Sequence, residues 1–216
     1  MQTLKRVLSL MDSLALRLAV KCIQVKTMLF YRLLFGEIGR CSIIYKPLRL
    51  LNPHNIFVGD HVYLYKQARI ETIEKWGDVI YTPKIVIGNR VSFEQRLHLI
   101  CVELVEIGDD TVVSADVMIT DNSHSYQEIH RKVMDQSLKF KKTIIGKFCF
   151  IGMGARIMAG TKLGDNCIVG SNSVVSGQFP GYVVLAGAPA KIIKRYDFET
   201  NKWRKTNDKG DFINEV

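Results

Sequence analysis

The chain has 216 residues, a length that fits one main domain with appendages. The apolar share of 47% and the charged share of 24% are ordinary for a soluble globular protein, whereas the net charge of +9 predicts an anionic partner. Nucleic acid is set aside as that partner because no aromatic side chains are interleaved with the basic ones. The five cysteines form no CxxC pair, which argues against a disulfide framework or a structural zinc site and indicates a reducing compartment.

Residues 1–36 are predicted to be helical, because they are rich in leucine and contain no proline and no glycine before Gly36. Basic side chains interrupt the apolar ones, so no run reaches the ~18 to 20 residues of a spanning helix. A signal-peptide core with a cleavage site is not recognised either. We therefore expect a cytoplasmic protein whose first segment packs on the following domain or a neighbouring subunit. The alternative is a basic amphipathic helix lying on a membrane surface.

An internal repeat with a period of six is the strongest feature of the sequence. Branched aliphatic residues recur at every sixth position from 145 to 175, and glycine follows most of them. Small residues occupy the fourth position after the aliphatic one. The aliphatic series is Ile145, Ile151, Ile157, Leu163, Val169 and Val175, and the small series is Cys149, Ala155, Thr161, Cys167 and Ser173.

The same unit recurs upstream, beginning at Val58, Ile87 and Ile107, with breaks at 75–84, between Leu99 and Ile107, and at about 122–143. Six residues fit a short strand with a tight corner, so three units would form a triangular coil whose aliphatic side chains point inward. A β-sandwich is the competing interpretation, but it predicts a period of two and irregular turns. Residues 39–57 are expected to form an imperfect first coil. Cys149 and Cys167 are expected to be buried, reduced neighbours in one interior column.

The repeat divides the chain into three parts. Residues 1–36 form the helical segment, 37–195 the β-helix domain, and 196–216 a mixed-charge tail that is either a short helix or disordered. The break at 122–143 carries an excess of basic side chains and is predicted to be a long loop that leaves the coils at one corner. Long loops on rigid scaffolds often carry function.

Three segments together resemble the hexapeptide-repeat acyltransferases, the family of bacterial galactoside, maltose and capsule O-acetyltransferases. They are the ladder of hexads, the segment Ile119-Thr-Asp-Asn-Ser-His-Ser-Tyr126 and the closing segment Val184-Leu-Ala-Gly-Ala-Pro-Ala-Lys-Ile-Ile-Lys194. The resemblance covers roughly residues 40–195. It implies a mainly β fold, a left-handed parallel β-helix, and a homotrimer that binds acetyl-CoA between two subunits.

The resemblance assigns His124 as the catalytic base. Direct acyl transfer needs a group that takes the proton of the acceptor, and an imidazole suits this task at neutral pH. Asp121 or a backbone carbonyl could fix the tautomer of His124. On the residues alone, a single histidine is more often structural or merely exposed. No pattern of an activated serine or cysteine indicates a covalent acyl-enzyme.

The resemblance also implies cofactor contacts along the last coils. The matching positions are Met153, Gly154, Ser171, Ser176, Gly177, Lys191 and Lys194. The two lysines are expected to meet phosphates, although a solvated basic surface is the alternative. Met153 and Gly177 depart from the family pattern, which more often has a small residue and a lysine there. No metal site is expected, because His61, His98 and His124 lack the spacing of the γ-class carbonic anhydrases that share this fold.

The acceptor is less well defined. Candidate contacts are Glu94, Gln95, Asn122, Tyr126 and His130. The coil before His124 has Glu94 and Gln95 where some sugar acetyltransferases have an asparagine, so simple galactoside or maltose specificity is not supported. We expect O-acetylation of a sugar or glycan precursor of cell-surface polysaccharide, such as a capsule or lipopolysaccharide unit. The alternatives are N-acetylation of an amino sugar or a xenobiotic, and a non-catalytic β-helix scaffold.

Overall fold

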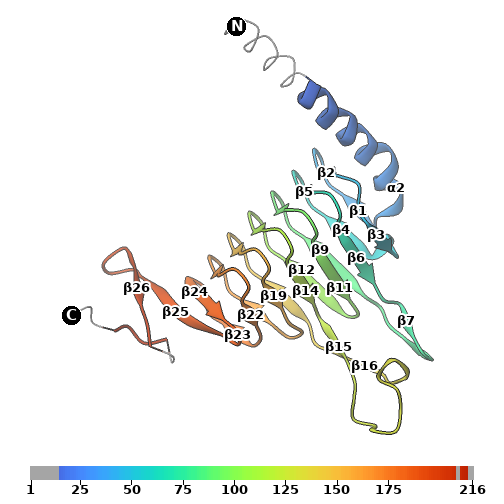
Figure 1. Ribbon diagram of the computed structural model, residues 1–216. Coiled ribbons are helices and arrows are strands. Elements are labelled where there is room, and N and C mark those ends of the chain that lie inside the picture. Colours follow the sequence, from blue (N-terminus) through green and yellow to red (C-terminus); the bar gives the residue numbers. More distant parts are fainter. Residues whose placement is uncertain (1–14, 208–209, 214–216) are drawn as a thin grey trace, which may run out of the picture.

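The computed structural model describes residues 15–207 and 210–213 of the chain. Short strands stack as a three-sided prism, in which each coil contributes one strand to each of three parallel sheets (Figure 1). This is the predicted left-handed parallel β-helix. We call the sheets face 1, face 2 and face 3 in the order in which the chain visits them.

Each face consists of parallel neighbours in the order of the coils. Face 1 contains β1 (Glu37–Ile38), β4 (Ile56–Val58), β9 (Lys84–Ile87), β12 (Leu104–Ile107), β17 (Thr143–Ile145), β20 (Lys162–Leu163) and β23 (Gln178–Phe179). Face 2 contains β2 (Ile43–Ile44), β5 (Tyr63–Leu64), β10 (Ser92–Phe93), β13 (Val112–Val113), β18 (Phe150–Ile151), β21 (Ile168–Val169) and β24 (Val183–Gly187). Face 3 contains β3 (Arg49–Leu51), β6 (Arg69–Thr72), β11 (His98–Cys101), β14 (Met118–Thr120), β19 (Arg156–Ile157) and β22 (Val174–Val175).

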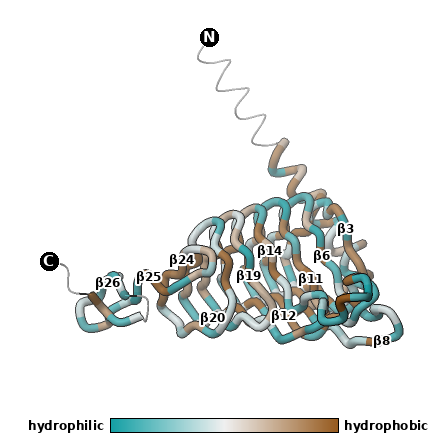
Figure 2. Tube along the Cα trace, turned by 60° about the horizontal axis from the view of Figure 1, so that its bottom comes forward, coloured by the Kyte–Doolittle hydropathy of each residue, from teal (hydrophilic) through white to brown (hydrophobic). Residues whose placement is uncertain are grey.

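The aliphatic ladder fills the interior of the prism, as the hexads predict. Ile151, Ile157, Val169 and Val175 are fully buried, and the small side chains between them are buried as well. Burial of one such isoleucine stabilises the fold by ~1.5–3 kcal/mol. In Figure 2 hydrophobic segments recur from coil to coil along the prism. Cys149 and Cys167 are buried free thiols, as expected for one interior column.

The glycines that follow the aliphatic positions are not required for an unusual backbone conformation, since no positive φ occurs at Gly88 or Gly108. A Cβ atom on Gly88 would lie 2.7 Å from the backbone nitrogen of Asp109 in the next coil. Glycine is therefore required because stacked coils approach closely at this corner. The left-handed conformation falls on other corner residues, including Arg90, Arg96 and Phe148.

All three breaks in the repeat lie at one corner, where the chain passes from face 3 to face 1. The first break forms a small hairpin of β7 (Lys75–Trp76) and β8 (Val79–Ile80). The second adds Val102 and Glu103 to a coil. The third is the excursion, which contains β15 (Asn122–His124), η3 (Val133–Asp135) and β16 (Leu138–Phe140), with β15 and β16 antiparallel. Figure 1 shows β7 and the excursion projecting from the same side of the prism.

A helix covers the first coil, which confirms the predicted helical segment for residues 15–34; residues 1–14 lie outside the described part. The helix includes a π-helical turn, η1 (Thr27–Tyr31), and ends with α2 (Arg32–Leu34). The Thr27 hydroxyl accepts a hydrogen bond of 2.9 Å from the backbone N–H of Ile44 in the first coil. Tyr31 and Phe35 are buried against the end of the core.

The first coil also contains a short 3₁₀ turn, η2 (Pro53–Asn55).

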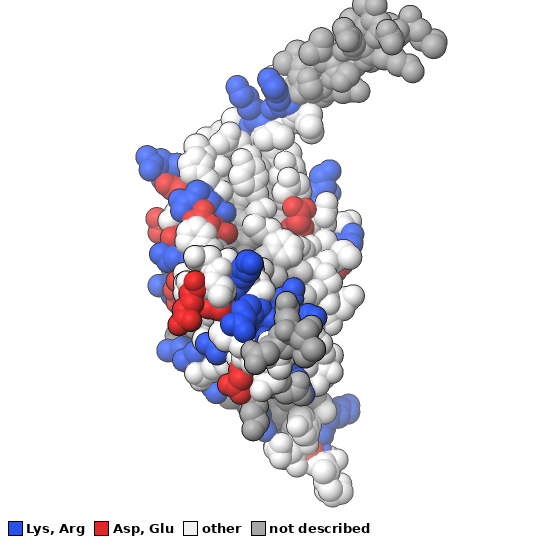
Figure 3. Space-filling view, turned by 90° about the vertical axis from the view of Figure 1, so that its left-hand side faces the viewer, with Lys and Arg blue, Asp and Glu red and all other residues white. Residues whose placement is uncertain are grey.

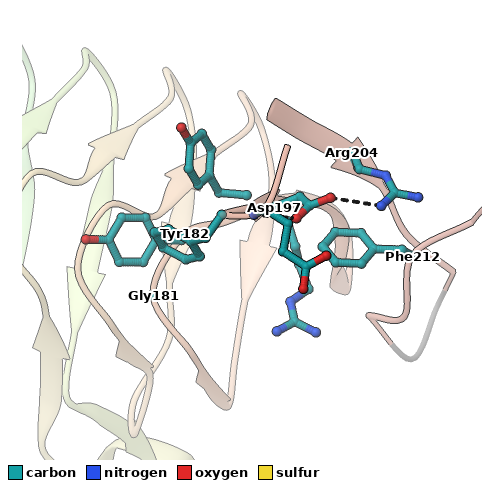
Figure 4. A pocket seen from close by; sticks show the side chains of 9 residues that line it. Gly181, Tyr182, Asp197, Arg204 and Phe212 are labelled. Atoms are coloured by element: carbon teal, nitrogen blue, oxygen red, sulfur yellow. Dashed lines mark hydrogen bonds and ion pairs between the residues drawn. The ribbon is translucent and has the colours of Figure 1, made fainter. Parts of the chain in front are cut away.

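The prediction for the tail was wrong, because its described part forms neither a helix nor a disordered segment. β25 (Ala190–Asp197) turns back on β24 and runs across the expected boundary at 196, and β26 (Lys202–Lys205) pairs antiparallel with it. Arg204 donates to the carboxylate of Asp197 at 2.9 Å and lies over the ring of Phe212 (Figure 4). The Arg204 pairing lowers the pKa of Asp197 to about 2. The contacts of Arg204 with Asp197 and Phe212 show that side-chain packing continues beyond the last coil.

Candidate active site

His124 lies at the outer surface, at the end of β15 and close to the prism. Its side chain is exposed, and its partner in the antiparallel ladder is Leu138 of β16. The ring of Trp76, from the β7–β8 hairpin, lies 5.1 Å from the imidazole, centroid to centroid, with a tilt of 57°. The imidazole therefore combines access from solvent with a defined aromatic neighbour.

Trp76 also fixes the excursion. Its indole nitrogen donates to the carbonyl of Gln136 at 3.0 Å. The side chain of Gln136 is buried and bridges the loop, since it donates to the carbonyls of Glu128 and Arg131 and accepts from the N–H of Glu128. A small apolar cluster of Tyr81, Val102 and Leu138, with Ile73 and Trp76 packed on it, lies below. Two insertions far apart in sequence hold each other in place beside His124.

Sequence reasoning did not identify Trp76 as a site residue. The available signal was that the break at 75–84 contains a tryptophan next to Gly77, in a chain with only two tryptophans. Trp76 could be assigned to the site only if the breaks at 75–84 and 122–143 were known to lie at the same corner of the prism. That depends on how many residues each interrupted coil contains, which the sequence does not state.

Asp121 is fully buried beneath the excursion. Its carboxylate accepts hydrogen bonds from the backbone N–H groups of Val102, Glu103 and Leu104, at 2.7 to 3.1 Å. Among the described residues, its side-chain hydrogen bonds do not include the ring of His124. These contacts anchor the start of the excursion to the two extra residues of the preceding coil. The expected tautomer-fixing contact with His124 is therefore not present in this structure, and Asp121 can act on His124 only through the chain.

The predicted acceptor residues lie in two places. Asn122 lies two residues before His124, and its amide donates to Thr120 and Asp121. Tyr126 and His130 are exposed on the excursion, and Lys139 lies over the ring of Tyr126. Glu94 and Gln95, in contrast, follow β10 at the corner between faces 2 and 3. One chain therefore does not bring all five together.

The predicted cofactor residues are divided in the same way. One group lies in a column with Gln95 at the corner between faces 2 and 3 and consists of Met153, Gly154 and Ser171. Backbone hydrogen bonds connect successive coils in this column, from Asp116 to Gln95, from Gly154 to Ala115 and from Asn172 to Met153. Ser176 and Gly177 follow β22 at the other corner, two coils below the residues that flank the excursion. Lys191 and Lys194 are exposed on β25. The predicted site residues thus fall into two groups at opposite edges of face 3, with Lys191 and Lys194 apart from both on β25.

Comparisons with known proteins agree with this architecture. Residues 142–177 match the family model described as bacterial transferase hexapeptide (six repeats). WbbJ of Escherichia coli (strain K12), named provisionally as a lipopolysaccharide biosynthesis O-acetyl transferase, is 30% identical over 187 residues, covering 83% of this chain and 88% of that one.

Solved structures share the fold at lower sequence identity. The N-acyltransferase AntD from Bacillus cereus, in complex with dTDP and 3-hydroxybutyryl-CoA, has a TM-score of 0.66 at 19% identity, over 79% of this chain and 88% of that chain. A galactoside acetyltransferase in complex with coenzyme A has a TM-score of 0.55 at 18% identity, over 92% and 88% of the two chains.

Proposed function

Because the chain belongs to the hexapeptide-repeat acyltransferase family, we propose that it transfers an acetyl group from acetyl-CoA to a hydroxyl of a sugar in a cell-surface polysaccharide precursor. The observation that carries this proposal is the exposed imidazole of His124, held between two insertions at the one corner where the repeat is broken. The relative WbbJ, through its name, supports a glycan acceptor.

His124 takes the proton of the acceptor hydroxyl as that oxygen attacks, and it later returns the proton to the leaving thiolate. Base catalysis by a positioned side chain contributes roughly 10²–10⁴-fold to a rate. Trp76 restricts the imidazole by its ring contact, and Asp121 restricts the strand that carries it. Both are positioning residues in this proposal.

The residues present fit an acyl-CoA. Acetyl-CoA supplies the activated thioester, whose acyl carbon accepts the attack. Small residues at the corners, Ser171, Ser176 and Gly177, are compatible with an extended chain, and a Cβ atom on Gly177 would meet only the ring of Phe179, at 3.9 Å. Gly154 is close-packed instead, since a Cβ atom there would collide with Oδ1 of Asn172. In this proposal, Lys191 and Lys194, which are exposed on β25, meet the phosphates as compact cations.

A homotrimer would complete the site, because the two halves of the predicted set lie at different corners of one prism. The outer surface of face 2 supports such an assembly. Tyr63, Val112 and Phe150 occupy equivalent, exposed positions there, with Ser92 between Tyr63 and Val112. The row continues with the half-buried Ile168 and Val184. Exposed rows of this kind typically mark interfaces. In a trimer, the corner that carries His124 would face the corner that carries Gln95 and Met153 of a neighbour.

The basic side chains around His124 support an anionic acceptor. The excursion and its flanks carry Arg131, Lys132, Lys139, Lys141 and Lys142. This charge favours an anionic glycan, a nucleotide sugar or a phosphate-linked precursor. Glu94, Gln95, Asn122, Tyr126 and His130 remain the proposed contacts. N-acetylation of an amino sugar is the second candidate, because the structural neighbour AntD is an N-acyltransferase.

The described residues include no helix long and apolar enough to cross a bilayer. A cytoplasmic location, with peripheral contact of residues 1–36 at a membrane, stays a prediction.

The test is release of CoA thiol with glycan intermediates as acceptors. We expect the His124→Ala variant to lose activity by roughly 10²–10⁴-fold with an unchanged melting temperature. His61→Asn is the matched control, because His61 is another exposed histidine, at a corner position with positive φ that asparagine tolerates. Equal rates at the background level for wild type and His124→Ala would refute the enzyme and favour a scaffold. Mild alkali distinguishes the two products, since it cleaves an acetyl ester and leaves an amide.

A further inference from the structure

The helix that covers the first coil uses only part of its surface for that contact. Thr27 and Tyr31 are buried, whereas seven large apolar side chains elsewhere on the described helix are exposed. Leu29 and Leu33 are 69% and 82% exposed. The exposed set is Leu16, Leu18, Val25, Leu29, Phe30, Leu33 and Leu34. Figure 1 shows the helix crossing the end of the prism and running out beyond it, so its first turns have no coil beneath them.

An apolar groove lies along the same part of the helix. It has a volume of about 500 Å³ and is lined by Gln24, Val25, Met28, Leu29, Arg40 and Cys41. The groove therefore extends the apolar surface from the helix to the first corner of the prism. A contiguous apolar area of this kind, bordered by basic side chains, usually marks an interaction site.

The charge on the helix has one sign. Between residues 15 and 34 the sequence contains Arg17, Lys21, Lys26 and Arg32 and no aspartate or glutamate. All four basic side chains are exposed, and within the described part of the chain none of them forms an ion pair with a carboxylate. On the prism, in contrast, Arg90 and Arg96 pair with aspartates of the next coil. In Figure 3 the described helix surface at the top is blue and white.

We propose that this helix lies flat on a bilayer surface that contains anionic lipids. The exposed leucines and Phe30 would enter the boundary between headgroups and acyl chains, while the arginines and lysines meet the lipid phosphates. A second copy of the chain fits the surface less well. Two copies of this helix would bring together like charges, with no carboxylate on the described helix to pair with them.

The contact would hold the prism by its N-terminal end. The coils then stack away from the lipid, and the C-terminal hairpin lies at the opposite end of the molecule (Figure 1). The proposal does not depend on the acetyl transfer, because vesicle binding is measured without a donor or an acceptor.

The experiment is flotation of the full chain with phosphatidylcholine vesicles, with and without phosphatidylglycerol. We expect binding only when phosphatidylglycerol is present, and weaker binding at high NaCl. The variant Leu18→Gln/Val25→Gln/Leu29→Gln should lower the partition coefficient by on the order of tenfold or more. Arg17→Gln/Lys21→Gln should lower it for the anionic vesicles, because two phosphate contacts are lost.

The matched control is Phe198→Gln, which changes a side chain of similar exposure, 64%, at the other end of the prism. It should bind vesicles as the wild type does. Absence of wild-type flotation, or equal flotation of the triple variant, would overturn the proposal. A fall in molecular mass of the triple variant in light scattering, together with no wild-type flotation, would instead assign the surface to a second copy. Melting temperatures of all variants establish that each is folded.

Discussion

The two halves of the prism differ in regularity. From Thr143 to Phe179 the repeat runs without an insertion, and equivalent strands such as β18 and β21 begin 18 residues apart. From Glu37 to Phe140 the coils are longer, and every insertion enters at the corner between faces 3 and 1. The regular half is a stack that buries one aliphatic side chain per strand. The irregular half uses the same stack as a base for the hairpin, the excursion and His124. The proposed base, His124, therefore lies where the repeat is interrupted, because an inserted segment can leave a coil without unpairing the strands of the sheet.

The largest effect on stability is expected in the irregular half, at Asp121. Replacing Asp121 by Ala would leave the buried N–H groups of Val102, Glu103 and Leu104 without an acceptor. We expect a loss of about 3–5 kcal/mol in the free energy of unfolding. Urea unfolding measures it. A midpoint equal to that of the wild type would show that the carboxylate does not hold this corner.

In the regular half, Ile157→Ala should destabilise by about 2–5 kcal/mol, because the fully buried side chain leaves a cavity that stacked coils cannot close. Ile157→Val, as the milder change, should cost ~0.5–1.5 kcal/mol. Both variants should keep the wild-type KM for the acceptor at temperatures where they are folded. A changed KM would break the proposed separation between a stabilising half and a catalytic half.

Trp76→Ala should lower kcat/KM by roughly 10- to 100-fold, because it removes both the ring beside His124 and the hydrogen bond to Gln136. Trp76→Phe keeps an aromatic face and should retain most of the activity. Steady-state kinetics with both variants would separate the ring contact from the hydrogen bond. Full activity of the alanine variant would remove Trp76 from the site.

The smallest expected effect is a pH dependence that arises on face 3. Burial lowers the pKa of His98, and the nearby Arg69 and Arg156 lower it further, while Glu71 opposes them. The unfolded chain, with a histidine pKa of about 6.5, then binds a proton more readily than the folded one. Stability is therefore complete above that value and falls as the pH drops below it. The unfolding midpoint between neutral and mildly acid pH should decline less in His98→Gln than in the wild type, and parallel curves would contradict this.

The periodicity determined a great deal without any structure. Inward aliphatic positions such as Ile151 and small positions such as Cys167 follow from a period of six, since each strand repeats the same local geometry and the same burial. The break points at 75–84 and 122–143 were also visible, because a missing hexad is a local property of the sequence. His124 and the cofactor positions came from the family resemblance and stay predictions.

Only the tertiary structure decided what the breaks do. The sequence does not state that Trp76 and His124 meet, because their separation along the chain depends on how many residues each interrupted coil consumes. Nor does it reveal that Asp121 binds backbone N–H groups, or that β25 folds back on β24 of the last coil and pairs in turn with β26. Local patterns determine each strand, whereas contacts between insertions depend on the stacking that brings them to one corner.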